Sequence, residues 1–233
     1  MIPAPEKLII ALDVPDIAAA KELVKNINNE AVFYKIGLEL MMSDGYFELL
    51  EWLKAQNKKV FVDLKLYDIS ETVGRAIKNL QKYQIDLLTI HTASRDIMRQ
   101  ASQNKGLTKI IGVTVLTSLD KRDLDEMGFD PAISLENLVI KKAGLALECG
   151  LDGVVASALE AKKLRQNFGK DFLIVTPGIR LEDITSDDQK RVADVKTALE
   201  NGSSHLVVGR PITRDNNPQE AAQKFNQLIT NFS

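Results

Sequence analysis

Cysteine and histidine are scarce in this sequence, which has one cysteine and two histidines in 233 residues. A single cysteine excludes an internal disulfide bond and is typical of a reducing compartment. The cysteine and the histidines also lack the spacing of a zinc site. We interpret Cys149, near the end of a predicted helix, as a residue of the hydrophobic core.

The sequence also lacks a membrane-spanning segment and a strong excess of either charge. No apolar run approaches the ~20 residues that cross a bilayer, and the first residues show no signal-peptide pattern. Thirty basic and 32 acidic residues give a formal charge of −2. This balance gives no support for nucleic-acid binding, although a local basic cluster could bind a phosphate. We therefore expect a soluble, cytoplasmic protein with no nucleic-acid or membrane partner.

What the sequence does contain is a regular alternation of apolar, β-branched segments with amphipathic ones. The segments predicted as strands are 8–14, 31–37, 59–66, 87–92, 109–117, 153–157, 172–178 and 205–211. The segments predicted as helices are 17–28, 46–56, 71–83, 94–104, 135–148, 159–168, 188–200 and 218–229. The longest irregular stretch, 121–131, is predicted as a loop at the active end.

This alternation predicts an α/β fold with a parallel sheet covered on both faces. Eight β/α units in 233 residues are typical of a (β/α)8 TIM barrel, so we predict one such domain over residues 1–233. The alternative is an open doubly wound sheet, but no Gly-x-Gly-x-x-Gly motif follows the first strand. In a TIM barrel, the catalytic groups lie at the C-terminal ends of the strands.

The third predicted strand carries charges in an otherwise apolar run. Side chains two apart share a face of a strand, so Asp63 and Lys65 point the same way as Phe61. Buried ions cost several kcal/mol each unless they are paired. With Asp68 and Lys35, these residues could form an alternating network, either as a structural ring of ion pairs or as catalytic machinery. We favour catalysis, because the cluster is dense and lies at the predicted active end.

The network also constrains the chemistry. A lysine between carboxylates has its charged form favoured, which argues against a Schiff-base lysine, because that lysine must lose its proton to attack. An ammonium in this setting suits the stabilisation and protonation of a carbanion.

Two glycine–arginine motifs follow the seventh and eighth strands. They are Gly178-Ile179-Arg180 and Gly209-Arg210, and Gln189 could add an amide donor from the loop 179–188. Loops at these positions form the usual phosphate site of TIM barrels, and arginine binds such anions through a fork of donors. Ordinary loop glycines and solvated arginines are the alternative. The joint placement of the two motifs favours phosphate binding.

Several single residues leave two interpretations open. Asp13 could bond a sugar hydroxyl or cap the next helix, and Thr117 and Ser157 could contact a heteroatom ring or belong to turns. His91 could be an acid–base group, but we interpret it as structural. His205 begins the last strand, at the opposite end, and is also interpreted as structural.

Taken in order along nearly the whole chain, the motifs are similar to those of one family. They are Ala11-Leu12-Asp13, Lys35-Ile36-Gly37, Asp63-x-Lys65-x-x-Asp68-Ile69-x-x-Thr72, Gly112-Val113-Thr114-x-Leu116-Thr117-Ser118, Thr176-Pro177-Gly178-Ile179-Arg180, Asp188-Gln189-x-Arg191 and Gly209-Arg210-Pro211-Ile212-Thr213. The chain resembles the orotidine 5′-phosphate decarboxylases, which catalyse the last step of de novo UMP synthesis. Tyr67 departs from the family pattern, where a histidine is common, and so does Ser70, where proline or a small residue is usual.

The resemblance implies a cofactor-free decarboxylation of orotidine 5′-phosphate to UMP and CO2. It implies that Lys65 protonates C6, that Asp63 lies beside the departing carboxylate and that Lys35 holds the network. It further implies a homodimer in which Asp68 and Thr72 reach the neighbouring active site. The residues that it implies for substrate binding are Asp13, Lys35, Thr72, Thr117, Ser157, Pro177, Arg180, Gln189, Gly209 and Arg210.

Other functions are compatible with parts of the pattern. Metal-dependent sugar-phosphate decarboxylases and hexulose-phosphate synthases share the Asp-x-Lys-x-x-Asp signature, but they carry a glutamate ligand on strand 2, where this chain has Lys35, a poor Mg²⁺ ligand. We therefore expect no metal. A nucleotide-binding barrel without turnover is the alternative from a different functional class.

Overall fold

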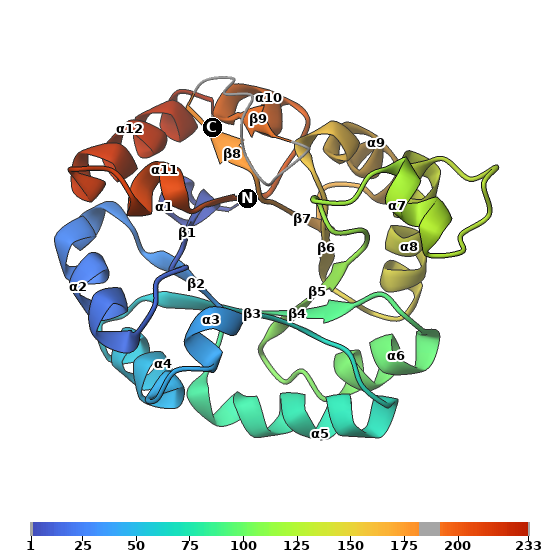
Figure 1. Ribbon diagram of the computed structural model, residues 1–233, viewed down its shortest axis with the longest axis horizontal. Helices are drawn as coiled ribbons and strands as arrows, with labels where there is room; N and C mark the ends of the chain where they lie inside the picture. The colour runs from blue at the N-terminus through green and yellow to red at the C-terminus, as the bar shows by residue number, and fades with distance from the viewer. Residues whose placement is uncertain (1, 182–191, 233) are drawn as a thin grey trace.

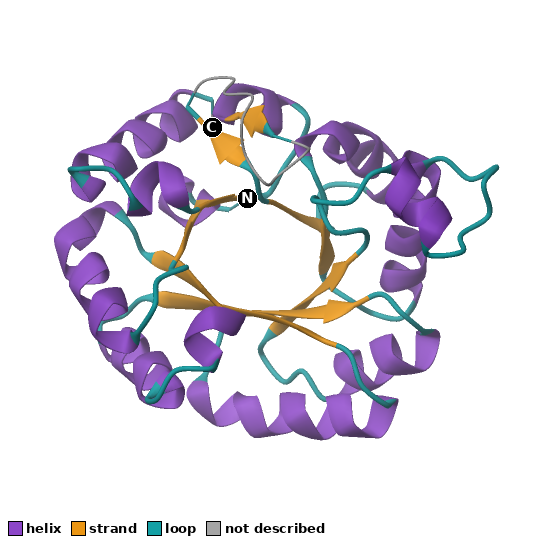
Figure 2. Cartoon of the chain, viewed as in Figure 1, coloured by secondary structure: helices purple, strands orange, loops and turns teal. Residues whose placement is uncertain are grey.

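The computed structural model describes residues 2–181 and 192–232, and its parallel strands close into a barrel surrounded by helices (Figures 1 and 2). The strands neighbour one another in the order β1-β10-β7-β6-β5-β4-β3-β2. Their bounds are β1 Leu8–Ala11, β2 Phe33–Gly37, β3 Lys59–Leu66, β4 Leu87–His91, β5 Lys109–Val113, β6 Gly153–Val155, β7 Leu173–Thr176 and β10 His205–Val208. This arrangement confirms the predicted TIM barrel.

Helices cover the outside of the barrel. Their bounds are α1 Ala4–Lys7, α2 Ile17–Ile27, α3 Leu38–Met41, α4 Tyr46–Ala55, α5 Ser70–Leu80, α6 Arg95–Gln103, α7 Lys121–Glu126, α8 Leu135–Glu148, α9 Ala158–Phe168, α10 Val195–Glu200, α11 Arg210–Thr213 and α12 Pro218–Asn231. Two 3₁₀ helices, η1 Asn28–Glu30 and η2 Gln81–Tyr83, extend α2 and α5. Side-chain caps begin several helices. Asp16 accepts the N–H of Ala19 at 2.8 Å, and Ser134 accepts that of Asn137 at 3.1 Å.

The predicted elements agree best with the structure where the hydrophobic pattern extends over many residues. The strand 59–66 and the helix 135–148 match β3 and α8 at both ends. Several strands are shorter than predicted, because residues after Ala11 and after Val113 leave the sheet to form loops at the active end. The predicted loop 121–131 contains α7, which a capping box at Asp120 begins.

The prediction for the segment between β7 and β10 also differs from the structure. The helix predicted over 188–200 begins at Val195, and Ala193–Asp194 form a short strand, β9, which pairs with β8 at Ile179–Arg180. Residues 188–191 of that prediction lie outside the described residues. The short elements α1, α3 and α11 were also missed, because four residues carry no detectable period.

Two apolar clusters pack against the two faces of the barrel wall. The inner cluster fills the barrel with Ile9, Ala11, Phe33, Phe61, Leu87, Ile111, Leu173, Val175 and Val207. The outer cluster contains Val60 and Val62 and packs the strands against the helices. Phe61 therefore points inward between two residues that point outward, as the strand alternation predicts. In the part of the chain described, no helix is both long and apolar enough to span a membrane.

Candidate active site

Four charged side chains form a continuous chain of alternating sign at the C-terminal end of the barrel. The Lys35 ammonium lies 2.9 Å from Asp13 Oδ1 and 3.6 Å from Asp63 Oδ2. The Lys65 ammonium lies 3.0 Å from both Asp63 oxygens. Asp63 is thus shared by two lysines, and the order of charges is Asp13, Lys35, Asp63, Lys65.

Neighbouring strands place these groups in reach of one another. The register pairs Ala11 of β1 with Lys35 of β2, and Gly37 of β2 with Asp63 of β3. A Cβ atom at Gly37 would lie 3.2 Å from the Lys35 ammonium, closer than nearly all such contacts, so the glycine leaves room for this charge. Asp16, rather than Asp13, caps α2, which leaves Asp13 for the ion pair.

Burial and charge act against each other on the inner members of this chain. Burial alone raises the pKa of Asp63, but the charges of Lys35 and Lys65 and the hydrogen bonds from Lys65 and Thr89 hold it below its ordinary value. Burial lowers the pKa of Lys35, but the charges of Asp63 and Asp13 outweigh burial and raise it. Both groups are therefore ionised at neutral pH. The outer members are more open, with 54% of the Asp13 side chain and 31% of the Lys65 side chain exposed.

Thr89 on β4 completes the network, and the sequence analysis missed it. Its hydroxyl donates to Asp63 Oδ1 at 2.8 Å and accepts the backbone N–H of Lys65 at 2.9 Å. Lys65 has a left-handed backbone with a φ of +49°, a conformation that non-glycine residues adopt rarely. A threonine inside an apolar strand gives no sequence signal that would separate it from a packing residue.

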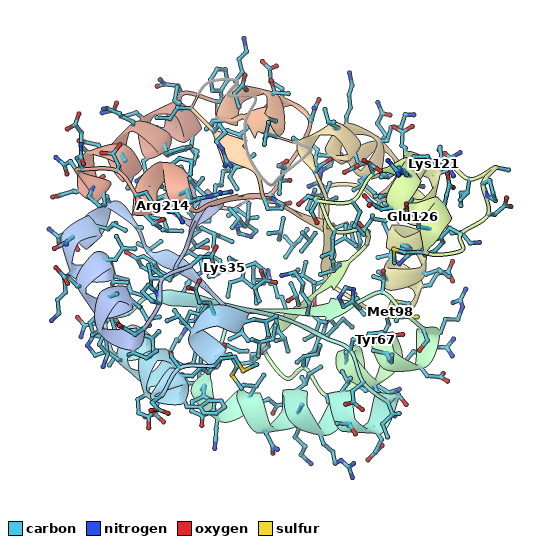
Figure 3. All side chains as sticks on the ribbon, viewed as in Figure 1. Lys35, Tyr67, Met98, Lys121, Glu126 and Arg214 are labelled. Atoms are coloured by element: carbon cyan, nitrogen blue, oxygen red, sulfur yellow. The ribbon has the colours of Figure 1, made fainter. Side chains whose placement is uncertain are left out.

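The charged chain faces a cavity of about 740 Å³, a size in the range of small-molecule sites. The predicted site residues that line it are Asp13, Lys35, Asp63, Lys65, Thr117, Pro177, Arg180, Gly209 and Arg210. Apolar residues of the inner cluster, among them Phe61 and Val175, also line the cavity. Figure 3 shows Lys35 inside the ring of strands.

Arginines line the cavity beside the ends of β7 and β10. They include Arg180 and Arg210, whose predicted role is phosphate binding, and Gly178 has a φ of +77°, which would strain any larger residue. Arg214, just after α11, also lines the cavity and was not predicted (Figure 3). The predicted contribution of Gln189 lies outside the described residues.

The comparison with protein families agrees with this geometry. The model described as "Orotidine 5'-phosphate decarboxylase / HUMPS family" matches residues 6–225. The chain belongs to this family. An orotidine 5′-phosphate decarboxylase of Methylococcus capsulatus is 49% identical over 98% of this chain and 93% of its own length. One of Nitrobacter winogradskyi is 47% identical over 94% of this chain and 91% of its own length.

Solved structures of the family share the fold. The crystal structure of the orotidine 5′-phosphate decarboxylase of Lactobacillus acidophilus superposes with a TM-score of 0.85 at 32% identity, covering 96% of this chain and 99% of that one. The Pyrococcus horikoshii enzyme, at 23% identity and a TM-score of 0.75, covers 96% of this chain and 99% of that one and has the same fold.

Three residues that the family resemblance implied do not line the cavity of the single chain. Asp68 is exposed in the turn after β3, where its carboxylate accepts the N–H of Ile69 at 2.6 Å, and within one chain the second carboxylate of the ion network is Asp13. Thr72 lies in the first turn of α5. Ser157 is fully buried as the N-cap of α9, and its hydroxyl bonds to Glu160.

The two histidines occupy opposite ends of the barrel wall. His91 ends β4, where burial and the charges of Lys142 and Lys65 lower its pKa. His205 begins β10, and its Nδ1 lies 2.9 Å from the carbonyl oxygen of Glu6. His205 lines a second cavity of about 530 Å³, separate from the cavity that the charged chain faces.

Proposed function

We propose that this chain decarboxylates orotidine 5′-phosphate to UMP and CO2, the final step of de novo pyrimidine synthesis, without a cofactor. Its family and the names of its relatives support this reaction. The observation that carries the proposal is the Lys65 ammonium, held 3.0 Å from a buried carboxylate at the cavity. This is the arrangement that protonation of a carbanion requires.

Lys65 acts on the carbon that loses CO2. The bond from C6 to the carboxyl carbon breaks with both electrons left on C6, in an orbital of the ring plane that the π system cannot delocalise. An adjacent ammonium stabilises this charge and then transfers a proton to C6. Lys65 is 31% exposed and regains its proton from water.

Asp63 faces the carboxylate that leaves. With Lys35 and Lys65 on either side, Asp63 stays ionised and repels a second carboxylate placed beside it. Binding of the remote phosphate by Arg180 and Arg210 supplies the free energy that holds the substrate against this repulsion. Gly209 allows close approach, Gln189 adds a donor, and Asp13 and Lys35 contact the ribose.

Thr117, Pro177 and Ser157 are proposed to contact the substrate as well. Thr117 and Pro177 line the cavity and are in place for this role. Ser157 is buried in the capping box of α9, so a contact with the pyrimidine requires its hydroxyl to turn away from Glu160.

We also propose that the active unit is a homodimer, in which Asp68 and Thr72 of each copy complete the other copy's site. Asp68 is exposed, and exposed apolar residues follow β2 and β3 near the same end of the barrel. These are Leu38 at 52%, Met42 at 80%, Tyr67 at 70% and Ile69 at 70% exposure. A second copy that covered this surface would bury it and bring Asp68 to a cavity.

The alternative within the family is metal-dependent sugar-phosphate chemistry. It needs a carboxylate on β2, and the structure has the Lys35 ammonium there, between Asp13 and Asp63. Within residues 2–181 and 192–232, no group of three or more metal-ligating side chains comes together. The ammonium at this position favours the decarboxylation of orotidine 5′-phosphate.

The experiment follows the ultraviolet absorbance of orotidine 5′-phosphate with the purified protein in EDTA. We expect conversion to UMP by the wild type, and a fall of at least about a hundredfold in kcat for Lys65→Ala. Lys59→Ala, in an ion pair at the opposite end, is the matched control and keeps its activity. A folded wild type that binds UMP without conversion would overturn the proposal and identify a nucleotide-binding barrel. Conversion only after a divalent metal is restored would favour the metal-dependent alternative.

A further inference from the structure

The two proposed catalytic residues of β3 lie in a bulge of the barrel wall. The pairing of β3 with β4 joins Val62 to Leu88 and then Leu66 to Ile90. Three residues of β3, Asp63 to Lys65, therefore lie opposite a single residue of β4, which is Thr89. Bulges of this kind re-aim side chains next to active sites, and here the bulge contains both Asp63 and Lys65.

A bulge leaves backbone groups without their usual partners in the ladder. The N–H of Lys65 finds its acceptor in the Thr89 hydroxyl at 2.9 Å. The proton of the same hydroxyl points to Asp63 Oδ1 at 2.8 Å. Thr89 is fully buried, so no water competes for either bond, and one oxygen atom ties the backbone of the lysine to the carboxylate of the aspartate.

This double contact fixes the backbone conformation of Lys65 and the direction of the Asp63 carboxylate, and the proposed reaction needs both. The bond to the N–H holds Lys65 in its left-handed conformation, with a φ of +49°, which a non-glycine residue keeps only where its surroundings hold it in place. The bond to Asp63 sets the direction of the carboxylate, and with Lys65 and Lys35 it keeps the pKa of Asp63 below its ordinary value against the effect of burial.

We propose that Thr89 is a positioning residue for the reaction, because its hydroxyl sets Lys65 and Asp63 in the mutual geometry that decarboxylation requires. The inference rests on the proposed function. Thr89 does not line the cavity, so it acts through Lys65 and Asp63 rather than on the substrate. The competing explanation is that the hydroxyl only satisfies a buried N–H and contributes to stability.

The test compares Thr89→Val, which keeps the shape and removes the hydroxyl, with Thr89→Ser, which restores it. Thr92→Val is the matched control, because the buried Thr92, just after β4, donates its hydroxyl at 2.8 Å only to the backbone oxygen of Val113. We expect Thr89→Val to lower kcat about ten- to a hundredfold, the effect of one hydrogen bond to a charged group. KM should change little, Thr89→Ser should recover most of kcat, and Thr92→Val should retain it.

A second measurement separates positioning from stability and does not depend on turnover. The carboxyl ¹³C signal of Asp63, assigned with Asp63→Asn, reports its titration. We expect Thr89→Val to raise the pKa of Asp63 relative to wild type, because a hydrogen bond to the ionised form is lost. Thr89→Ser and Thr92→Val should leave the pKa of Asp63 at its wild-type value.

The outcomes distinguish this inference from the proposed function. If the wild type does not convert orotidine 5′-phosphate, the proposed function fails, while the titration still tests the contact of Thr89 with Asp63. If the wild type is active and Thr89→Val lowers only the unfolding temperature, with kcat and the titration of Asp63 unchanged, Thr89 is structural and the inference is wrong. If Thr89→Val does not fold, a Thr89→Ser variant with low kcat overturns it as well.

Discussion

The two ends of the barrel use the same residue types in different ways. At the C-terminal end, the carboxylate of Asp63 contacts the side chains of two lysines and a threonine. At the N-terminal end, Asp86 bonds one lysine, Lys54, at 2.8 Å and also accepts the N–H of Val60 at 2.9 Å.

The N-terminal arrangement is repeated further around the barrel. Asp152 bonds Lys105 at 2.7 Å and accepts the N–H of Ile110 at 2.9 Å. Asp86 and Asp152 each tie the start of one strand to the segment before another, so their charges hold the wall together. The carboxylate of Asp63, by contrast, is held among side chains at an open cavity. The partners of the carboxylates, more than their burial, therefore separate the proposed catalytic network from the structural ion pairs.

The largest expected effect comes from removing the same charge at each end. Asp63→Asn should lower kcat about 10²- to 10⁴-fold, because the substrate carboxylate is no longer repelled and the lysines lose their shared anion. Asp86→Asn should keep kcat within a few-fold and lower the free energy of unfolding by about 1–3 kcal/mol. Steady-state kinetics and urea denaturation of both variants measure this. Equal losses of activity would contradict the division between the two ends.

An effect of intermediate size is expected on the pH dependence of stability, and it comes from His205 at the N-terminal end of the barrel. Burial lowers the pKa of His205 to about 4, whereas the unfolded chain binds this proton near pH 6.5. The unfolded state therefore binds more protons between these values, so stability falls as pH drops from about 6.5 to about 4, by about 3 kcal/mol.

Denaturation of wild type and His205→Gln across this range checks the assignment. The variant should lose most of this slope, since glutamine does not titrate. The lowered pKa of Asp63 also stabilises the folded state. This contribution to stability is lost only at lower pH, as the pH falls through the folded-state pKa of Asp63. An unchanged slope in His205→Gln would place the titration elsewhere.

The smallest effect is expected at the cavity mouth. Arg214→Gln should lower kcat/KM about three- to tenfold and weaken its dependence on salt, because a cation at the cavity attracts a phosphorylated substrate. Arg122→Gln, on α7 and with 88% of its side chain exposed, is the matched control. Stopped-flow or steady-state measurements at two ionic strengths decide the matter. Identical salt dependence in both variants would remove Arg214 from substrate capture.

Sequence periodicity predicted the barrel and the inward direction of Asp63 and Lys65, because both depend on local patterns of period two and on alternation. It did not predict Thr89, because its role depends on a bulge that offsets two strands by two residues. Asp13 was left between two roles, and the structure shows that it pairs with Lys35 while Asp16 caps the helix. Asp68 does not join the network within one chain, because it lies exposed in the turn after β3, and its place in a neighbouring site stays a prediction.

The inner apolar cluster affects how molecules enter and leave the barrel. Ile9, Ile111 and Val175 are fully buried, and the cluster that they belong to fills the barrel below the charged groups. Within the described residues, this cluster thus closes the inner end of the cavity. In the proposed reaction, the nucleotide and CO2 therefore share the open end of the cavity, so the gas molecule, formed at the inner end, leaves past the nucleotide or after its release.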